Sequence, residues 1–319
     1  MRKILFIAPH FMGYDEEICK ELSAEWDVTY VDSEKYLAPV RLNYRHKNTV
    51  IKALLKVVSP FRDLYRDKML SLYFTTKIEN WMKLKCYDAV LVINGDGIPN
   101  NVYNMIKLNS PSAKFILYIW DDLKCLFKKN HLHYFDSIIS YNIDDCRRYN
   151  YKYLPVFTRP IIRKKQEKLI YDIAIIATAN EHRIKLAKKV YEKYKDIYRF
   201  YIYFYDKELH YDFFSYSTPL SFDLYLNILQ KSKVVLEIPR HGQRGPTTRM
   251  FDALEASTKV ITTNKYIKKY PVYNDKNIFV MKWDCIIPKE FIVEHYDPSN
   301  NPIYISEWLH CLNIVNEEV

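Results

Sequence analysis

The stretch 237–252 combines residues that suit the binding of an anion: three arginines, two glycines and a carboxylate at each end. It follows the apolar run 234–236, which predicts a buried strand. It leads into a predicted helix that starts near Pro246, since proline suits the first helical position. Unpaired N–H groups at a helix start attract anions, and guanidinium groups match phosphate oxygens, so the stretch predicts a phosphate site. Its arginines are Arg240, Arg244 and Arg249.

Glycine is scarce in this chain, and its few glycines mark the same kind of position. An average protein of 319 residues would hold roughly twenty, at about 7% usage, whereas this one has five. All five lie in three short loops that directly follow strand-like apolar runs. Glycine is used where φ is positive or where a ligand approaches the backbone, so we interpret the loops as lining a ligand cleft; the alternative is a set of tight turns. They are Gly13, Gly95, Gly97, Gly242 and Gly245.

Apolar runs and helical patterns alternate along the whole chain. A continuous apolar run such as 87–93 is typical of a strand buried on both faces of a parallel sheet. The alternation with helices predicts an α/β fold of doubly wound, Rossmann-like sheets. In such sheets ligands bind beyond the carboxyl ends of the strands, where all three glycine loops are expected.

The length of the chain suits two such domains. We place the first domain at 1–158 and the second at 159–302, because the stretch 155–168 carries two prolines and a charged run typical of a linker. Residues 303–319 contain a further predicted helix, which we expect to pack back on the first domain. Glycine loops in both domains predict an interdomain cleft.

The formal net charge of +10 is concentrated in one segment. Residues 41–85 hold eleven Lys and Arg against three acidic residues, interleaved with large apolar side chains. This pattern is typical of basic amphipathic helices, which suit an anionic membrane surface or a polyanionic partner; the alternative is a solvated face with a basic bias. No base-reading motif accompanies the charge, so we expect no nucleic-acid partner.

The cysteines and the apolar runs indicate the cellular compartment in which the protein works. The six cysteines are far apart, with no CxxC pair and no histidine at ligand spacing, so we expect reduced thiols and no zinc or other metal site. The opening residues are too short for a signal peptide, and no apolar run approaches the roughly 20 residues that span a bilayer. We therefore expect a cytoplasmic protein, at most peripheral at the inner face of the cell membrane.

The stretch 247–263, which contains Arg249, Phe251 and Asp252, resembles the nucleotide-sugar motif of GT-B glycosyltransferases. It is most similar to the CgeB-like, or glycosyl transferases group 1-like, group, often found in surface-polysaccharide gene sets. The pattern of that group is Arg-x-Phe-Glu-Ala-Leu-Ala-x-Gly-x-x-Val-Ile-Thr. Weaker similarities to the same group lie at 87–91, 119–122 and 171–177.

The resemblance implies a GT-B fold, a nucleotide-diphosphate sugar as co-substrate, and no cofactor or bound metal. It implies that Asp252 binds the ribose hydroxyls and that arginines bind the diphosphate. Ser257 stands where the group has glycine, so we expect that turn to be made differently. Glu237 only loosely resembles the first glutamate of a Glu-x7-Glu pair, and we expect it to pair with Arg240. The donor-binding residues are then Arg240, Arg244, Gly245, Thr247, Thr248, Arg249 and Asp252.

An inverting enzyme needs a base that deprotonates the acceptor hydroxyl, whereas a retaining one needs none. The candidates in the first domain follow strand-like runs: Asp96, Asp15, His10 and Asp122. We favour Asp96 or Asp15 over His10, because Asp96 lies between two glycines that hold it exposed and a lone histidine is often structural. The pair 121–122 also resembles the metal-binding carboxylates of GT-A enzymes, but the two-domain pattern argues against that interpretation.

These observations predict a metal-independent glycosyltransferase of bacterial surface-polysaccharide biosynthesis, that is, of capsule, O-antigen or lipopolysaccharide. Its acceptor would be a glycan or a lipid-linked sugar. One alternative is a nucleotide-sugar epimerase or a polyol-phosphate transferase on the same fold. A further alternative is a non-enzymatic nucleic-acid binder.

Overall fold

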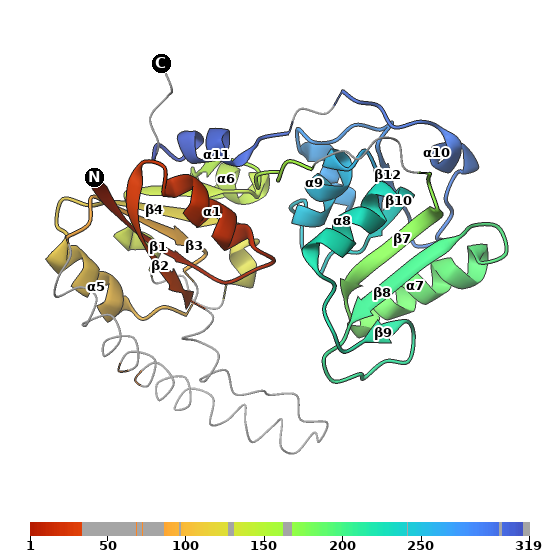
Figure 1. Ribbon diagram of the computed structural model, residues 1–319, viewed down its shortest axis with the longest axis horizontal. Helices are drawn as coiled ribbons and strands as arrows, with labels where there is room; N and C mark the ends of the chain where they lie inside the picture. Colours follow the sequence, from red (N-terminus) through yellow and green to blue (C-terminus); the bar gives the residue numbers. More distant parts are fainter. Residues whose placement is uncertain are drawn as a thin grey trace. The chain divides into compact units, whose positions relative to one another are not determined.

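The computed structural model describes residues 1–33, 68, 72, 86–95, 97–126, 131–161, 168–240, 242–299 and 302–314 (Figure 1). The chain forms two compact units: Met1–Leu154 with Leu309–Val319, and Pro155–Trp308. The chain thus first passes from one unit to the other after Leu154, four residues before the boundary predicted at residue 158. The helix predicted in the tail is α11 (Ile305–Cys311), and the second crossing lies within it.

The first unit is built on a six-stranded sheet with the order β2-β1-β3-β4-β5-β6, in which every neighbouring pair is parallel. Its strands are β1 (Arg2–Ala8), β2 (Trp26–Asp32), β3 (Ala89–Ile93), β4 (Lys114–Ile119), β5 (Ser137–Ser140) and β6 (Lys152–Tyr153). Its helices are α1 (Tyr14–Leu22), α5 (Asn100–Asn109) and α6 (Ile143–Tyr149), with short 3-10 turns at Leu123–Cys125 and Leu132–Tyr134.

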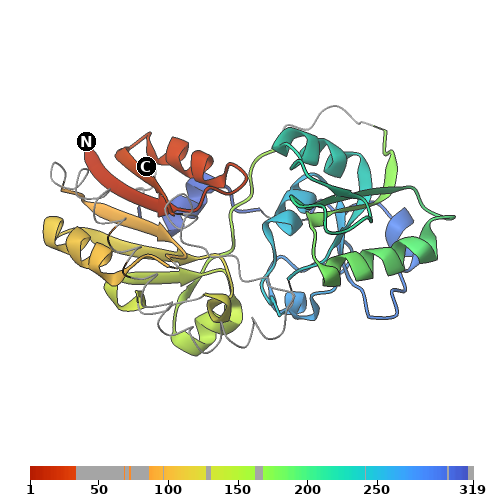
Figure 2. The same ribbon diagram turned by 90° about the horizontal axis from the view of Figure 1, so that it is seen from below.

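Helices cover both faces of this first sheet, as Figure 2 shows. All five residues of β3 are buried, as expected for an apolar strand inside a parallel sheet. Val102 and Ile106 of α5 pack with alternate residues of β1, β3 and β4 in one apolar core. Ile18 and Leu22 of α1 are fully buried. They lie four positions apart in the sequence, which places them on the same face of the helix.

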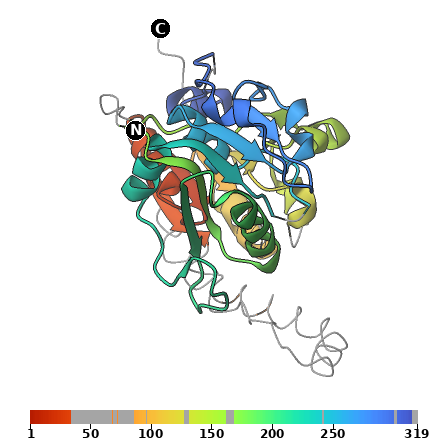
Figure 3. The same cartoon turned by 90° about the vertical axis from the view of Figure 1, so that its right-hand side faces the viewer.

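The second unit has a second all-parallel sheet, with the order β12-β11-β10-β7-β8-β9. Its strands are β7 (Tyr171–Thr178), β8 (Phe200–Tyr205), β9 (Ser215–Tyr216), β10 (Ser232–Glu237), β11 (Lys259–Thr262) and β12 (Ile278–Val280). Its helices include α7 (Glu181–Tyr194), α8 (Phe222–Gln230), α9 (Thr248–Glu255) and α10 (Lys289–Val293), with a 3-10 turn at Lys265–Lys269. Figure 3 shows α7 running alongside the strands of this sheet.

Strand order reverses once in each sheet, and these two points organise both units. In the first sheet the chain leaves β1 for β2 on one side and later places β3 on the other. In the second sheet β8 lies on one side of β7 and β10 on the other. The loops that leave such neighbouring strands diverge to opposite faces and open a crevice at the carboxyl edge, which is where open α/β sheets bind ligands. We therefore expect ligand-binding residues among those that follow β1, β3, β7 and β10.

The structure defines the start of α9 and the turn that follows it. Helix α9 begins at Thr248, with Thr247 as the preceding cap residue, so Pro246 lies outside the helix. Ser257 adopts the left-handed conformation, with φ of 59°, so the turn after α9 is made with the backbone geometry that glycine favours, although serine stands there. The Thr258 N–H reaches the Ala253 carbonyl at 2.8 Å across this turn.

The basic segment 41–85 lies outside the described residues, apart from positions 68 and 72. Within the described part of the chain, no helix has the length and the apolar character needed to cross a membrane.

Candidate functional site

Glu237 ends β10 at the switch point of the second sheet. Its carboxylate is 1% exposed and accepts a hydrogen bond from the Thr247 hydroxyl and another from the Thr262 hydroxyl, each at 2.5 Å. The expected pairing with Arg240 is therefore wrong. The two hydroxyls tie the loop before α9 to the end of β11. Because Thr247 donates to Glu237, its side chain makes no capping bond to α9.

Arg183 is the functional residue that the sequence analysis missed. It lies in the first turn of α7 and is buried, with 6% of its surface exposed. Its Nε donates to the Ile238 carbonyl at 2.8 Å, and its Nη1 donates to the Thr178 hydroxyl at 2.6 Å. It thus bridges the loops that leave β7 and β10. The available signal was its position just after the first strand of the second domain.

Arg183, Arg240 and Arg249 form what we call the arginine cluster. Burial and the positive charges of Arg249 and Arg240 together lower the pKa of Arg183 to about 10, against the opposing effect of Glu237. Among the described residues, none of the three has a carboxylate within 4.0 Å. The Arg249 Nε is buried and has no hydrogen-bond partner there. Of the three only Arg183 is a buried residue; since an unpaired buried cation is costly, the cluster suits an anion.

Arg244 contacts an aromatic side chain. Its guanidinium stands 4.8 Å from the centre of the Tyr266 ring, a cation–π distance. The backbone beside it is held by Asn264, whose Nδ2 donates to the Arg244 carbonyl at 2.8 Å and to the Gly245 carbonyl at 3.4 Å. Thr248, the other predicted threonine, opens α9. The structure therefore brings two of the three predicted arginines together with Arg183.

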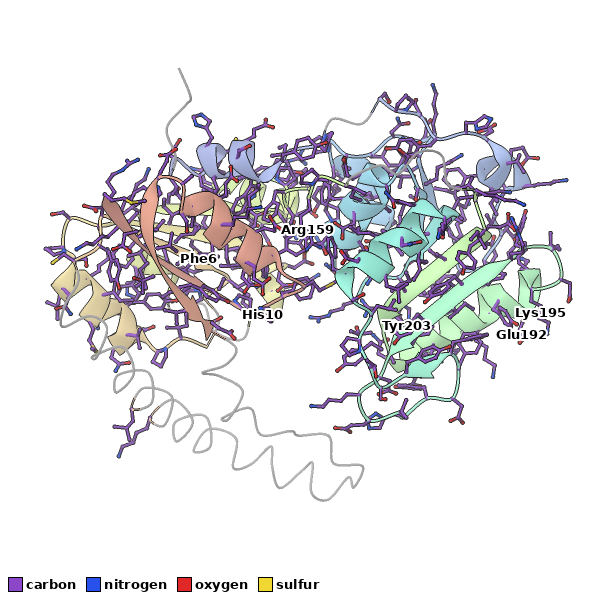
Figure 4. The ribbon with its side chains drawn as sticks, viewed as in Figure 1. Phe6, His10, Arg159, Glu192, Lys195 and Tyr203 are labelled. Atoms are coloured by element: carbon purple, nitrogen blue, oxygen red, sulfur yellow. The ribbon has the colours of Figure 1, made fainter. Side chains whose placement is uncertain are left out.

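Asp252 is buried in α9, with 2% exposure. Its Oδ2 accepts a hydrogen bond from the Tyr225 hydroxyl at 3.2 Å and lies 4.0 Å from Nη2 of Arg159. The Arg159 guanidinium, labelled in Figure 4, in turn stands 3.4 Å from the centre of the Phe222 ring. A ribose would have to displace one of these neighbours to reach the carboxylate. The ribose role of Asp252 stays a prediction.

His10 and Asp15 meet in the loop that follows β1, at the switch point of the first sheet. The His10 Nδ1 lies 2.9 Å from Asp15 Oδ2. Asp15 is 1% exposed and also accepts hydrogen bonds from the Tyr30 hydroxyl at 2.8 Å and from the Phe11 N–H at 3.1 Å. The His10 side chain is 57% exposed, and Figure 4 labels it. In this dyad the imidazole of His10 is exposed to solvent, and its hydrogen bond to the buried carboxylate of Asp15 holds it in place.

The dyad shifts the pKa of both partners. The hydrogen bond and the charge of Asp15 raise the pKa of His10 above its ordinary value. Burial alone would raise the pKa of Asp15, but the hydrogen bonds from His10, Tyr30 and Phe11 lower it on balance. Asp15 therefore stays ionised and orients His10, and His10 is the member of the pair that can reach a ligand.

Asp122 has hydrogen-bond partners of its own within the first unit. Asp122 is 2% exposed, and its Oδ1 accepts hydrogen bonds from Asn142 Nδ2 at 2.6 Å and the Tyr141 hydroxyl at 2.9 Å. These bonds fasten the loop after β4 to the start of α6, and the role of Asp122 as a base stays a prediction. Asp96 lies outside the described residues.

The glycines of the three loops are needed for side-chain packing as well as for turn geometry. Gly13, Gly95, Gly97 and Gly242 all have positive φ, as expected for glycine. At Gly95 a Cβ atom would lie 2.7 Å from the Tyr103 hydroxyl and 3.0 Å from the His131 ring. Side chains of the protein itself therefore require this glycine, without any ligand.

In the described part of the chain, no group of three or more His, Cys, Asp or Glu side chains is arranged to hold a metal ion. A cavity of about 460 Å³ lies in the second unit, lined by Tyr171, Tyr191, Arg199 and their neighbours. It opens where β7 and β8 begin, whereas the arginine cluster lies where β7 and β10 end. None of the predicted donor residues lines it, so the chemistry of the loops, and not this cavity, defines the candidate site.

No protein-family model matches the chain, and no curated protein matches it in sequence. Solved structures match it over nearly its full length. The N-terminal domain of Candida albicans trehalose-6-phosphate phosphatase aligns with a TM-score of 0.58 and 11% identity, covering 100% of this chain and 97% of that one. The Methanocaldococcus jannaschii UDP-GlcNAc 2-epimerase, in complex with UDP-GlcNAc and UDP, aligns at 0.53 and 12%, with 97% of each chain covered. The glycotransferase of kitacinnamycin aligns at 0.51 and 10%, covering 98% of this chain and 94% of that one.

At this level of identity the similarities establish the fold and not the activity. Two parallel six-stranded sheets in two units match the GT-B architecture of these structures, so the predicted α/β, GT-B fold class is confirmed. The narrower resemblance to the CgeB-like group stays a prediction.

Proposed function

We propose that this protein is a glycosyltransferase that moves a sugar from a nucleotide-diphosphate sugar to a hydroxyl of a glycan or lipid-linked acceptor. The arginine cluster carries this proposal. Three guanidinium groups gather at the switch point of the second sheet, and none has an ion pair among the described residues. The carboxylate whose charge acts on Arg183, that of Glu237, is already engaged by two threonines. A diphosphate supplies the missing negative charge and the acceptor oxygens.

The start of α9 adds to this anion site. Thr247 makes no side-chain cap, so the first N–H groups of the helix have no capping partner from that side chain. Helix-terminal N–H groups and guanidinium forks are the groups that neutralise a leaving diphosphate without a metal. We therefore expect activity to survive chelation by EDTA.

His10 supplies the base in this proposal. Asp15 faces its Nδ1 at 2.9 Å, which leaves Nε2 to accept the proton of the acceptor hydroxyl. As that proton moves, the hydroxyl oxygen forms a bond to the anomeric carbon. The bond from that carbon to the diphosphate oxygen breaks, and the electron pair leaves on the diphosphate. This single displacement inverts the anomeric configuration.

The geometry changes the order of preference among the base candidates. Asp15 is 1% exposed and engaged by three donors, so it orients the base and does not act as one. His10 is exposed, sits at the switch point, and has its basicity raised by Asp15. A general base of this kind contributes about 10²–10⁴-fold to rate.

The test begins with a thermal-shift screen of nucleoside diphosphates and of UDP- and GDP-sugars. We expect at least one to stabilise the protein in a concentration-dependent manner. Products are then analysed with the bound donor alone and with an added panel of glycans. Transfer to a glycan with inversion supports the proposal. Conversion of the donor to its epimer without an acceptor would instead establish an epimerase, and a screen in which no nucleotide shifts the melting temperature would overturn both.

We place this reaction in bacterial surface-polysaccharide biosynthesis, on the resemblance of 247–263 to that group. The basic segment 41–85 supports docking at an anionic membrane surface, where lipid-linked acceptors are found. Both points rest on the sequence and are tested separately from the transfer chemistry.

A further inference from the structure

We infer that the reacting unit of the acceptor is a neutral sugar ring that stacks on the Phe11 side chain beside the His10 imidazole. The inference rests on the proposed function, because it assigns the acceptor of that same site. Three features of the loop after β1 carry it: an aromatic ring that is both held and exposed, a strained apolar neighbour, and the sign of the surrounding charge.

Phe11 is a braced aromatic surface. Its ring stacks on the ring of Tyr14, with centroids 6.1 Å apart and planes at 23°, and meets the Trp120 ring edge-on at 6.1 Å. Its backbone is fixed as well, since its N–H donates to Asp15 at 3.1 Å. Yet the residue remains 42% exposed, whereas Tyr14 beneath it is fully buried. The ring is therefore held by neighbouring side chains and is still partly exposed to solvent.

Met12, the next residue, is also 42% exposed and adopts the left-handed conformation with φ of 49°. That region is costly for a residue with an unbranched apolar side chain. A loop that keeps two large apolar side chains in water, one of them on a strained backbone, gives up stability that a polar or glycine-rich turn would retain. Strain of this kind is concentrated at ligand sites. Both residues directly follow the candidate base.

The shared anchor makes the arrangement specific. One carboxylate, that of Asp15, holds the His10 imidazole through Oδ2 and the Phe11 backbone through Oδ1. The imidazole and the ring are thereby fixed relative to each other. A pyranose has a face of C–H groups that fits an aromatic face and a rim of hydroxyls that can reach an adjacent base. The pair therefore matches one sugar ring with its apolar face on Phe11 and a hydroxyl toward His10.

The charges around His10 select against an anionic acceptor unit. Within the described part of the chain, the charged groups that act on its imidazole are Asp15, Glu16 and Asp32, all of them acidic. Asp32 also accepts a hydrogen bond from the His10 N–H at 3.3 Å. A sugar phosphate or uronate placed on Phe11 would face this negative field, whereas a neutral ring would not. A lipid tail would satisfy Phe11 and Met12 but would offer no hydroxyl to His10.

The test uses the full chain and direct binding, so that it does not depend on the donor. Methyl glucoside, methyl galactoside and methyl N-acetylglucosaminide are titrated as neutral probes and followed by saturation-transfer NMR. Sugar phosphates and n-octanol serve as the anionic and apolar competitors. The variants are Phe11→Ala and Phe11→Tyr, and the matched control is Phe214→Ala, which removes an aromatic side chain of similar exposure (37%) from the second unit.

We expect at least one neutral glycoside to bind, with affinity lowered about tenfold by Phe11→Ala, restored by Phe11→Tyr and unchanged by Phe214→Ala. With a donor present, Phe11→Ala should raise the acceptor KM while leaving donor affinity unchanged. Tighter binding of the sugar phosphate, or displacement of the glycoside by octanol, would overturn the inference. So would equal losses in Phe11→Ala and Phe214→Ala.

The two proposals fail in different ways. If a nucleotide sugar binds and is turned over but no neutral glycoside contacts Phe11, only the acceptor inference is lost. If neutral glycosides stack on Phe11 but no nucleotide binds the arginine cluster, the transferase proposal is lost and the sugar site remains.

Discussion

The imidazole of His10 and the carboxylate of Asp15 form a dyad, with Nδ1 and Oδ2 2.9 Å apart. The carboxylate is buried and the imidazole is exposed. Hydrogen bonding at Nδ1 selects the tautomer that leaves Nε2 available as a base, and the neighbouring negative charge strengthens that base. The two residues lie five positions apart in one loop and the helix that follows it, so a single turn of chain builds both halves of the dyad.

This dyad predicts a pH dependence for glycosyl transfer. The base must be neutral, and the pKa of His10 is raised above 6.5 by Asp15, so kcat/KM should rise with pH through a midpoint above 6.5. Asp15→Asn removes the main cause of the shift. We expect it to move the midpoint down toward 6.5 and to lower the plateau, because the imidazole loses its orientation. The measurement is the pH profile of kcat/KM, which reports the free enzyme.

Glu17→Gln is the matched control for this experiment, since it removes one exposed negative charge from the same first turn of α1. It should leave the profile within experimental error. An Asp15→Asn profile with an unshifted midpoint would show that His10 is not the titrating base. His10→Gln should lower kcat by about 10²–10⁴-fold in the same assay.

The arginine cluster predicts how donor affinity depends on single charges. Arg249→Ala removes the guanidinium whose Nε is buried and has no partner in the described part of the chain. A lost charge-assisted hydrogen bond costs about 1.5–3 kcal/mol, so donor affinity should fall by roughly 10- to 100-fold. Calorimetry with the UDP- or GDP-sugar that binds the wild type measures this directly, and the melting temperature should stay near that of the wild type.

Lys188→Ala controls for net charge, because it removes an exposed cation from α7 of the same unit. Donor affinity in this variant should match the wild type. If both variants weaken binding equally, the effect is one of long-range charge and the cluster is not a contact site.

Sequence alone locates the loops of the site better than the side chains that fill it. The helices α6 and α7 follow the capping residues Asn142 and Asn180, and such caps are local signals in the sequence. Arg183 could not be singled out, since its burial depends on the Ile238 carbonyl 55 positions later in the chain. Asp252 faces the same limit, because its neighbour Arg159 comes from a segment 93 positions earlier.

Glu237 shows where more could have been predicted. The parallel register pairs it with Thr262 at the ends of β10 and β11, and both strands contain short apolar runs that are visible in the sequence. A carboxylate and a hydroxyl at the same level of adjacent strands are natural hydrogen-bond partners. The pairing with Arg240 was preferred because it is close in sequence, whereas the contacts of a buried strand end are set by the neighbouring strand.

Ser257 gives a test of backbone strain outside the site. It holds φ of 59°, which costs an L-residue about 1–2 kcal/mol, while glycine at such a position costs about 0.5–1 kcal/mol in the entropy of the unfolded chain. Ser257→Gly should therefore raise the free energy of unfolding by about 0.5–1 kcal/mol, measured as a shift of the urea midpoint. Ser257→Ala keeps the strain and should change stability little. A loss of stability in the glycine variant would contradict the strain argument.

The basic segment 41–85 predicts salt-sensitive membrane association. Each Lys or Arg near an anionic surface contributes about 1 kcal/mol, and this attraction is screened by salt. We expect the protein to co-sediment with vesicles that contain phosphatidylglycerol and to be released as the salt concentration rises. Equal pelleting with neutral phosphatidylcholine vesicles would reject an electrostatic mechanism.

Asp172 predicts how the second unit responds to acid. Its carboxylate lies 2.7 Å from Lys233 Nζ and 3.2 Å from Arg199 Nε; burial opposes ionisation, but these bonds lower its pKa to about 2. Because the unfolded pKa is about 3.9, the ionised group stabilises the fold above pH ~4, and that contribution is lost as pH falls toward 2. Asp172→Asn should therefore cost about 1–2 kcal/mol at pH 7, allowing for the exposed Arg199 partner. Urea denaturation should show this difference shrinking between pH 4 and 2, whereas a constant difference would assign the loss to packing.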